Sequence, residues 1–172
     1  VMYGRTTTTI LGNTLGVQAD KPFTSPSCID NDLAAKCNGS FSNLPLPEHL
    51  TFIETPGRLS GKNRLIGCSR DFNEVIRWFA ERADMIVLVF DAHKLDTSDE
   101  SKNATEAVQK HLEKMRLVLN KADMISSQQL MRVHGVLMWS LGKVLQTPEC
   151  LCVFFSSLCD QPFKDGLFTA LF

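Results

Sequence analysis

The sequence has no large excess of either charge and no long apolar run. Its formal net charge is −1, with 22% charged residues, so no basic field would attract nucleic acid, and we expect no nucleic-acid partner. No apolar run approaches the roughly 20 residues that a membrane-spanning helix needs. Its 172 residues, of which 44% are hydrophobic, suffice for one globular domain with a core. We expect this domain to be part of a longer protein.

The spacings of metal ligands and of disulfide frameworks are absent as well. The six cysteines include no Cys-x-x-Cys pair and no Cys/His cluster, so the sequence predicts neither a zinc site nor a disulfide scaffold. We interpret the cysteines as small buried side chains of a protein in a reducing compartment. A cytoplasmic location is the corresponding expectation.

Apolar patterns predict strands that alternate with helices. Four segments have the alternating or continuous apolar pattern of strands: 49–55, 85–92, 115–119 and 150–157. Three segments have helical spacing or capping signals: 71–84, 97–112 and 126–144. The last two begin with capping boxes, Thr97 with Glu100 and Ser126 with Gln129. The fold class is therefore α/β, a mostly parallel sheet flanked by helices, and the continuous apolar run over 85–92 predicts a strand covered on both faces.

Two further features concern the loops. Residues 20–47 are rich in Pro, Ser and Asn, which predicts a long loop. No stretch of the sequence has the pattern Gly-x-x-x-x-Gly-Lys-Ser/Thr, the loop that cradles nucleotide phosphates.

Polar residues follow three of the predicted strands: Glu54-Thr55-Pro56-Gly57, Asp91-Ala92-His93-Lys94 and Asn120-Lys121-Ala122-Asp123. Polar side chains at the end of a buried strand lose solvation unless another group bonds to them. Ligands of parallel sheets bind at the carboxyl ends of the strands. These motifs are therefore the candidate functional residues.

The order and spacing of the motifs resemble nucleotide triphosphatases of the Ras and dynamin type. Longer stretches are similar to the EH domain-containing (EHD) family of dynamin-like ATPases: "DKPF", "ETPGRLSG", "RWFAERADMIVLVFDAHKLDTSDE", "KMRLVLNKADMISSQQLMRV" and "GVLMWSLGKVLQTPE". The resemblance implies a partial dynamin-type nucleotide-binding domain over 1–172, whose first strand and phosphate loop would precede Val1. It divides the domain into four parts: switch I near 4–13, a variable Pro-rich loop over 20–47, switch II over 54–72 and the base-binding motif at 120–123.

The resemblance also implies roles for individual residues. Asn120, Lys121 and Asp123 would bind the nucleotide base, because an amide can meet a ring nitrogen, a lysine stem can lie along the ring face and a carboxylate can accept from the ring edge. Four residues would be catalytic: Thr9, Glu54, Thr55 and Gly57. Thr6 would contact the nucleotide, and Thr9 and Glu54 would contact Mg²⁺. Glu54 stands where the family has Asp, and its extra methylene has to fit the strict octahedral shell of Mg²⁺.

For the complete protein, the resemblance implies ATP and Mg²⁺ as cofactors and assembly into homo-oligomers. It further implies membrane remodelling in endocytic recycling, peripherally on endosomal or plasma membranes, through domains outside this chain. The chain alone is expected to be inactive, because it has no phosphate loop, so whether it is itself an enzyme stays open. Two alternatives also stay open: a non-catalytic module that docks on EHD oligomers, and a GTP-binding relative, since Asn-Lys-x-Asp also reads guanine.

Overall fold

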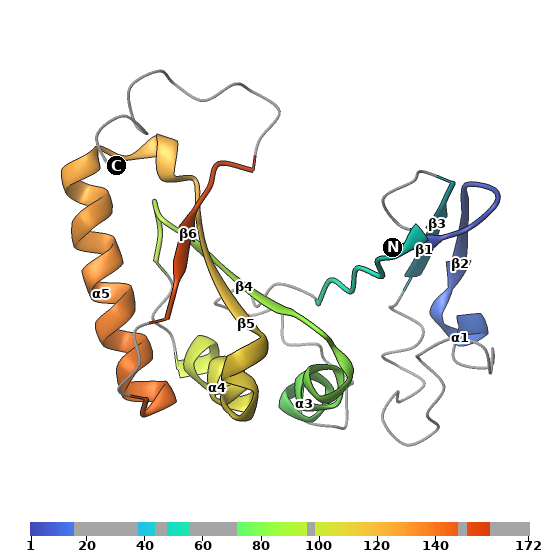
Figure 1. The fold of residues 1–172 in the computed structure, drawn as a ribbon, viewed down its shortest axis with the longest axis horizontal. Coiled ribbons are helices and arrows are strands. Elements are labelled where there is room, and N and C mark those ends of the chain that lie inside the picture. Colours follow the sequence, from blue (N-terminus) through green and yellow to red (C-terminus); the bar gives the residue numbers. More distant parts are fainter. Residues whose placement is uncertain (16–37, 44–47, 56–71, 96–98, 148–150, 159–172) are drawn as a thin grey trace. The chain divides into compact units, whose positions relative to one another are not determined.

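The computed structural model describes residues 1–15, 38–43, 48–55, 72–95, 99–147 and 151–158 (Figure 1). The chain divides into two compact units, Val1–Trp78 and Phe79–Phe172. We call them the N-terminal unit and the C-terminal unit and describe each by itself. Helix α3 (Phe72–Arg82) crosses the boundary between them and confirms the helix predicted over 71–84.

The N-terminal unit contains a small mixed sheet. Its strands are β1 (Met2–Tyr3), β2 (Thr8–Leu11) and β3 (Asn38–Ser42). Central β3 runs parallel to β1 and antiparallel to β2. A short helix, α1 (Gly12–Leu15), follows β2. The buried side chains of Met2, Leu15 and Phe41 form a small core, against which Ile10 packs.

Strand β3 corrects the prediction of a continuous loop over 20–47. Its sequence, Asn-Gly-Ser-Phe-Ser, contains few residues that favour strands. The strand forms because it pairs with strands on both sides and because Phe41 is buried. Gly39 leaves space for Leu15, whose Cδ1 atom would lie 2.5 Å from an added Cβ at that position.

The strand predicted over 49–55 is not formed. The Phe52 backbone N–H donates to the Val1 carbonyl at 2.9 Å, and the Val1 nitrogen donates back to the Phe52 carbonyl at 2.6 Å. This single reciprocal pair does not extend into a ladder, and residues 48–55 are exposed. An alternating pattern indicates that a segment suits a sheet, but a strand also requires a neighbour along its length.

The C-terminal unit is built on a parallel sheet of β4 (Ile86–Asp91), β5 (Met115–Asn120) and β6 (Val153–Phe155), in the order β4-β5-β6 (Figure 1). The connections contain α4 (Asp99–Ala107), the 3₁₀-helix η2 (Gln109–Lys114) and α5 (Ser127–Leu145), and one turn of 3₁₀-helix, η3 (Ala122–Met124), follows β5. Strands and helices alternate as expected, and strands β4 and β5 are confirmed.

One predicted helix ends earlier in the structure than expected, whereas the predicted start of another is confirmed. The helix expected over 97–112 ends at Ala107 and continues as η2, in which His111 has a non-helical φ of −124°. The capping box before α5 is confirmed: Gln129 N–H donates to Ser126 Oγ at 3.3 Å, and Ser126 N–H donates to Gln129 Oε1 at 3.0 Å. Thr97, of the other predicted capping box, lies outside the described residues.

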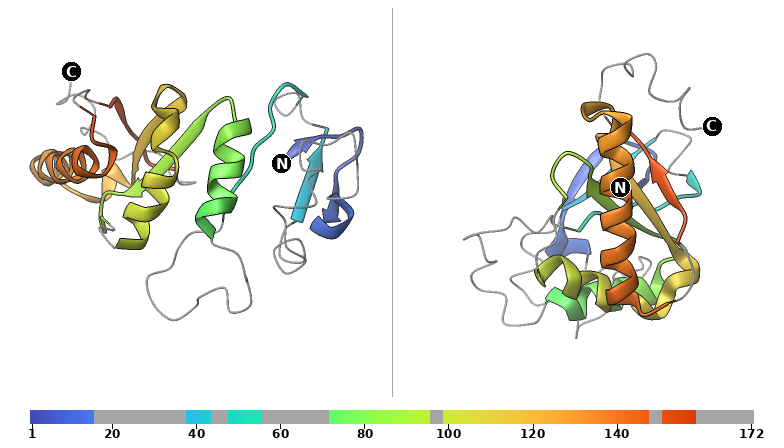
Figure 2. Two further views of the ribbon diagram at one scale, coloured as in Figure 1. Left: turned by 90° about the horizontal axis from the view of Figure 1, so that it is seen from below. Right: turned by 90° about the vertical axis from the view of Figure 1, so that its left-hand side faces the viewer.

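One face of the parallel sheet forms the core of the C-terminal unit. Met115, Leu117 and Leu119 of β5 are buried on it, and α4 and α5 lie along the same side of the sheet (Figure 2). Four leucines of α5 are buried: Leu130, Leu137, Leu141 and Leu145. Phe90 of β4 lines a small cavity together with Thr105 of α4 and Leu141 of α5. This contact places both helices against the core face.

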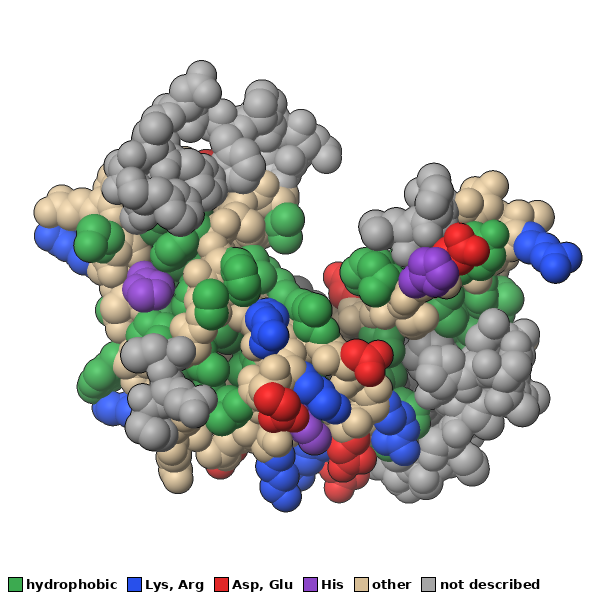
Figure 3. All heavy atoms as spheres, in the orientation of Figure 1, with side chains coloured by type: hydrophobic (Ala, Val, Ile, Leu, Met, Phe, Trp, Pro, Cys, Tyr) green, Lys and Arg blue, Asp and Glu red, His purple; other side chains and the backbone are tan. Residues whose placement is uncertain are grey.

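The opposite face corrects the prediction that residues 85–92 are covered on both sides. Val87 and Val89 of β4 are 50% and 55% exposed, and Phe154 of β6 is 49% exposed. Figure 3 shows hydrophobic side chains on the surface over β4 to β6. A continuous apolar run shows that the side chains on both faces of a strand are apolar. It does not show that other elements cover both faces.

Two further observations complete the fold. Among the described helices, none has the length and hydrophobicity needed to cross a bilayer. Cys152, the one cysteine within the described residues, is exposed, which corrects the expectation of burial for this position. It follows that Cys152 is open to thiol reagents.

The core of the C-terminal unit can be tested with two neighbouring residues of α5. Leu130 is fully buried whereas Met131 is 68% exposed. We expect Leu130→Ala to lower the free energy of unfolding by about 2–5 kcal/mol, because it removes buried methyl groups and leaves a cavity. The matched change Met131→Ala should alter it by less than about 0.5 kcal/mol. Urea unfolding followed by circular dichroism measures both, and equal losses would contradict the assigned core face.

Candidate functional site

The carboxyl end of β5 gathers the residues of the Asn-Lys-x-Asp motif. Asn120 is the last residue of the strand, and Asp123 lies in η3 directly after it. Between them, Lys121 has a left-handed backbone with φ of 60°, which lets the chain turn sharply out of the strand. Ala122 is fully buried, and its N–H donates to the Ser156 carbonyl at 3.1 Å. Ala122, a residue of the motif itself, therefore ties the turn to the segment that follows β6.

The amide of Asn120 is oriented by the loop that follows β6. Its Oδ1 accepts from the backbone N–H of Leu158 at 2.8 Å and from Ser156 Oγ at 3.4 Å. A backbone N–H can only donate, so the atom facing it has to be the amide oxygen. The Asn120 NH₂ group therefore points elsewhere, and no partner for it is found within the described part of the chain.

Asp123 is held by the same loop. Ser157 Oγ donates to Asp123 Oδ1 at 2.6 Å. The carboxylate is half-buried, and within the described residues its other oxygen, Oδ2, has no bonding partner. Asp123 therefore presents one oriented acceptor beside the Asn120 donors.

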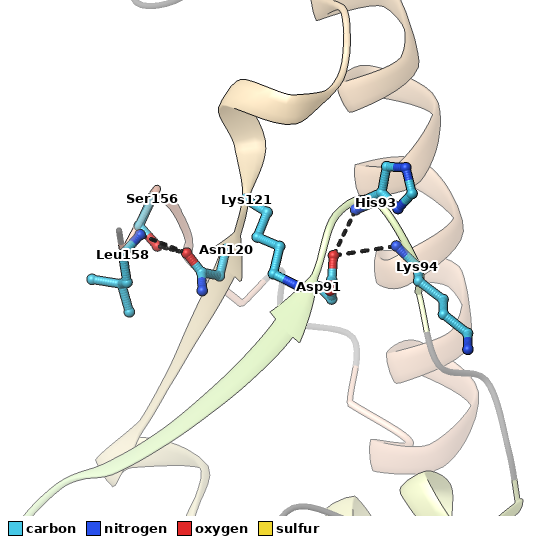
Figure 4. A network of polar contacts seen from close by, with 7 residues as sticks. All are labelled: Asp91, His93, Lys94, Asn120, Lys121, Ser156 and Leu158. Atoms are coloured by element: carbon cyan, nitrogen blue, oxygen red, sulfur yellow. Dashed lines mark hydrogen bonds and ion pairs between the residues drawn. The ribbon is translucent and has the colours of Figure 1, made fainter. Parts of the chain in front are cut away.

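Lys121 reaches from β5 to the end of β4. Its Nζ donates to Asp91 Oδ2 at 2.5 Å, while Asp91 Oδ1 accepts from the backbone N–H groups of His93 at 2.8 Å and Lys94 at 3.2 Å (Figure 4). Burial alone would raise the pKa of Asp91. The hydrogen bond from Lys121, the two backbone hydrogen bonds and the charge of Lys121 outweigh it, so the pKa lies below its ordinary value. Asp91 is therefore an anion at neutral pH.

Sequence reasoning missed four contributors to this site: Asp91, Ser156, Ser157 and Leu158. Asp91 stands in a strand-end motif but received no role, and the two serines fell inside the strand predicted over 150–157. A signal was present in the chain, because the carboxyl ends of neighbouring parallel strands meet at one edge. Polar residues that directly follow the strands beside β5 were therefore candidates.

The remaining predicted residues lie in the N-terminal unit. Thr9 is an exposed residue of β2, and Thr6 is exposed in the segment before that strand. Glu54 and Thr55 are exposed residues of a segment without regular secondary structure. Gly57, and most of the predicted 54–72 switch, lie outside the described residues. The catalytic and metal-binding roles of these residues stay predictions.

A metal site was also predicted, at Thr9 and Glu54. Within the described residues, no group of three or more His, Cys, Asp or Glu side chains could hold a metal ion. Mg²⁺ is commonly bound through one or two protein groups together with phosphates and water. A threonine with one glutamate is not such a group, so the roles of Thr9 and Glu54 toward Mg²⁺ stay predictions, and we derive no step through Mg²⁺.

Together the three motif residues suit one class of ligand. Asn120 offers amide donors, Asp123 offers a carboxylate acceptor, and Lys121 offers an aliphatic stem that is held at both ends. A planar heterocycle with a ring acceptor and an exocyclic donor could be bound at its edge by the first two and at its face by the third. The arrangement offers the groups that the predicted base-binding role requires, and that role stays a prediction.

The chain is similar in sequence to a nucleotide-binding domain family and to EH domain-containing proteins. Residues 27–140 match the family model of the CobW/HypB/UreG nucleotide-binding domain. The chain is 47% identical over 166 residues to EH domain-containing protein 1 of Arabidopsis thaliana, which covers 96% of this chain. It is 48% identical over 166 residues to EH domain-containing protein 2 of Homo sapiens, which covers 94% of it.

The chain spans 30% of the length of each of these two relatives. Nearly all of it aligns, so the resemblance found from the motifs extends over the described and the undescribed residues alike. The chain therefore belongs to the EH domain-containing proteins and carries, over residues 27–140, a nucleotide-binding domain of the CobW/HypB/UreG family.

Proposed function

We propose that this chain is the nucleotide-binding part of a dynamin-like ATPase and that its C-terminal unit recognises the base of ATP. The observation that carries the proposal is the convergence of Asn120, Lys121 and Asp123 at the carboxyl end of β5, with Asn120 and Asp123 each oriented by the loop after β6. A site whose polar groups are oriented before the ligand arrives loses less entropy on binding.

Each residue has a distinct part in binding the base. The NH₂ group of Asn120 donates to an acceptor nitrogen of the ring. Asp123 Oδ2 accepts from an exocyclic amine, while its Oδ1 stays bonded to Ser157. The methylene stem of Lys121 lies against the ring face. The same set would serve guanine, so a GTP-binding protein is the alternative that a nucleotide comparison decides.

For catalysis we propose the residues that the family resemblance indicates, Thr9, Glu54, Thr55 and Gly57, with Thr6 as a nucleotide contact. Mg²⁺ would be held mainly by the triphosphate, with Thr9 and Glu54 as its protein contacts, and would supply charge neutralisation to the transferred phosphoryl group. The sequence contains no Gly-x-x-x-x-Gly-Lys-Ser/Thr loop. We therefore propose that residues 1–172 alone do not turn over ATP, and that activity belongs to a longer protein.

The family resemblance supports a proposal for the wider role of the complete protein. We propose that the complete protein remodels membranes in endocytic recycling, bound peripherally from the cytoplasm to endosomal or plasma membranes. Membrane contact would come from domains outside this chain. A net charge of −1 agrees with the absence of a nucleic-acid partner from this proposal.

We further propose that the protein forms homo-oligomers, and the outer side of α5 supports this. Met131, Val136 and Trp139 are 68%, 51% and 66% exposed there, and the Lys143 ammonium lies 3.4 Å from the centroid of the Trp139 ring. Gly135 lies between them, and an added Cβ would meet nothing within 4 Å. A mid-helix glycine costs about 1 kcal/mol relative to alanine. Among the described residues no contact requires a glycine at this position, whereas a second copy could approach closely there.

The base site can be tested in the full-length protein with Asp123→Ala. We expect the Kd for ATP to rise by the equivalent of about 1.5–3 kcal/mol, because the variant loses a hydrogen bond to a charged group. Ser157→Ala should weaken binding less, since it removes only the group that orients Asp123. Isothermal titration calorimetry gives each Kd.

Two controls accompany this measurement. Asp84→Ala removes an exposed carboxylate just before β4 and should leave the Kd unchanged. An unchanged Kd in Asp123→Ala would remove Asp123 from the site. A preference of wild-type protein for GTP over ATP of tenfold, about 1.4 kcal/mol, would overturn the choice of ATP.

The catalytic assignment can be tested at position 54. We expect Glu54→Asp to raise the ATP turnover of the full-length protein, because shortening the side chain by one methylene restores the carboxylate position found in the family, and small misplacements at a reacting centre are costly. Steady-state phosphate release measures the change. Equal or lower turnover would show that the longer side chain is accommodated, and absent turnover in both proteins would favour a non-catalytic module.

The oligomer proposal is tested by Trp139→Ala in the full-length protein. We expect a lower mass in light scattering coupled to size exclusion, since large aromatic anchors dominate interfaces. Gln128→Ala, an exposed polar change on the same helix, is the matched control. An unchanged mass for Trp139→Ala, with circular dichroism like that of the wild type, would rule out this face as the interface.

A further inference from the structure

Asp91 is the charged residue of the site that the proposed base contacts do not use. It ends β4 and is paired in register with Asn120 of β5. We infer that Asp91 is a positioning residue of the base site: its carboxylate holds the Lys121 ammonium, so that the lysine stem lies across the strand ends as the apolar surface on which the base rests. This inference rests on the proposed function of the site.

The carboxylate of Asp91 is itself fixed before it meets Lys121. Its Oδ1 accepts from two successive backbone N–H groups, those of His93 and Lys94. These bonds close a turn at the end of β4 and leave Oδ2 directed at Lys121 Nζ, 2.5 Å away (Figure 4). A further backbone bond, from Ala92 N–H to the Asn120 carbonyl at 2.8 Å, ties the two strand ends together. Donor and acceptor are therefore carried on one rigid edge.

Lys121 needs such an anchor because little else orders its side chain. The side chain is 50% exposed, and a free lysine side chain loses an appreciable amount of rotamer entropy when it is ordered. A stem that is ordered only when the base arrives would reduce affinity by part of this amount. Held at its backbone by the turn and at its ammonium by Asp91, the stem is ordered beforehand.

The ion pair between Asp91 and Lys121 also gives different roles to the ammonium and to the methylene groups of the lysine. The ammonium is bound to a carboxylate, so its charge serves as the anchor. The methylene groups between anchor and backbone are left as the contact surface for a ring. Removing Asp91 and removing the lysine charge should therefore have the same consequence, because each releases the stem.

A double-mutant cycle in the full-length protein tests this assignment. The variants are Asp91→Asn, Lys121→Met and the double variant, and the probes are ATP and inorganic tripolyphosphate, each with Mg²⁺ in calorimetry. We expect Asp91→Asn to weaken ATP binding about threefold, in line with the small energies of half-exposed ion pairs. In the Lys121→Met background the same change should have no further effect. Tripolyphosphate binding should be equal in all four proteins, because the pair acts on the base.

Three results would overturn the inference: an unchanged ATP Kd in Asp91→Asn, the same loss in both backgrounds, or an equal loss for tripolyphosphate, which indicates general structural damage. Glu106→Gln, an exposed carboxylate on α4, is the control and should change neither Kd. The Asp123→Ala measurement separates this inference from the proposed function. If Asp123→Ala weakens ATP binding and Asp91→Asn does not, the base site stands and the positioning role fails. If neither has an effect, the base site itself is wrong.

Discussion

The central position of β5 is the constraint on which the C-terminal unit depends. Within the described residues it is the one strand of this unit with hydrogen-bonded neighbours on both sides. Leu117 and Leu119 are fully buried on its core face, and a slip of one residue would turn that face outward. Fixing these leucines therefore also fixes where the strand ends, and so where Asn120 and the turn after it are placed.

The candidate site is a consequence of parallel pairing around this strand. Because β4, β5 and β6 run in the same direction, the segments that follow them arrive at one edge of the sheet. Asp91 comes from one neighbour of β5 and Ser157 from the other, and each bonds to a side chain of the motif between them. The motif is thus supported from both sides by groups that are distant in sequence. Both local chemistry and sheet topology contribute to its geometry.

How much was predictable from sequence depended on whether the deciding interactions are local. The apolar pattern of β5 and the capping box at Ser126 specify a strand and a helix start within a few residues, and both predictions were correct. Strand β3 was missed because its pairing partners lie 27 to 39 residues away in the chain. The prediction of a strand over 49–55 was wrong because its pattern carried no information about a neighbouring strand. The position of Asn120, Lys121 and Asp123 followed from the end of a strand. The supporting groups depended on which strands adjoin β5, which the sequence does not state.

The backbone at Lys121 has a consequence for how substitutions there are to be understood. With φ of 60°, most residues other than glycine are strained, by roughly 1–2 kcal/mol, and asparagine less than most. Glycine would relax the turn yet leave nothing to span the gap to β4, and asparagine would tolerate the turn but fall short of Asp91. A replacement at this position therefore combines two opposing effects. It can relieve the strain of the backbone, and it can lose the side-chain length that reaches Asp91. A variant that raises the melting temperature while weakening ligand binding would be the expected signature of a position where conformational cost and side-chain length oppose each other.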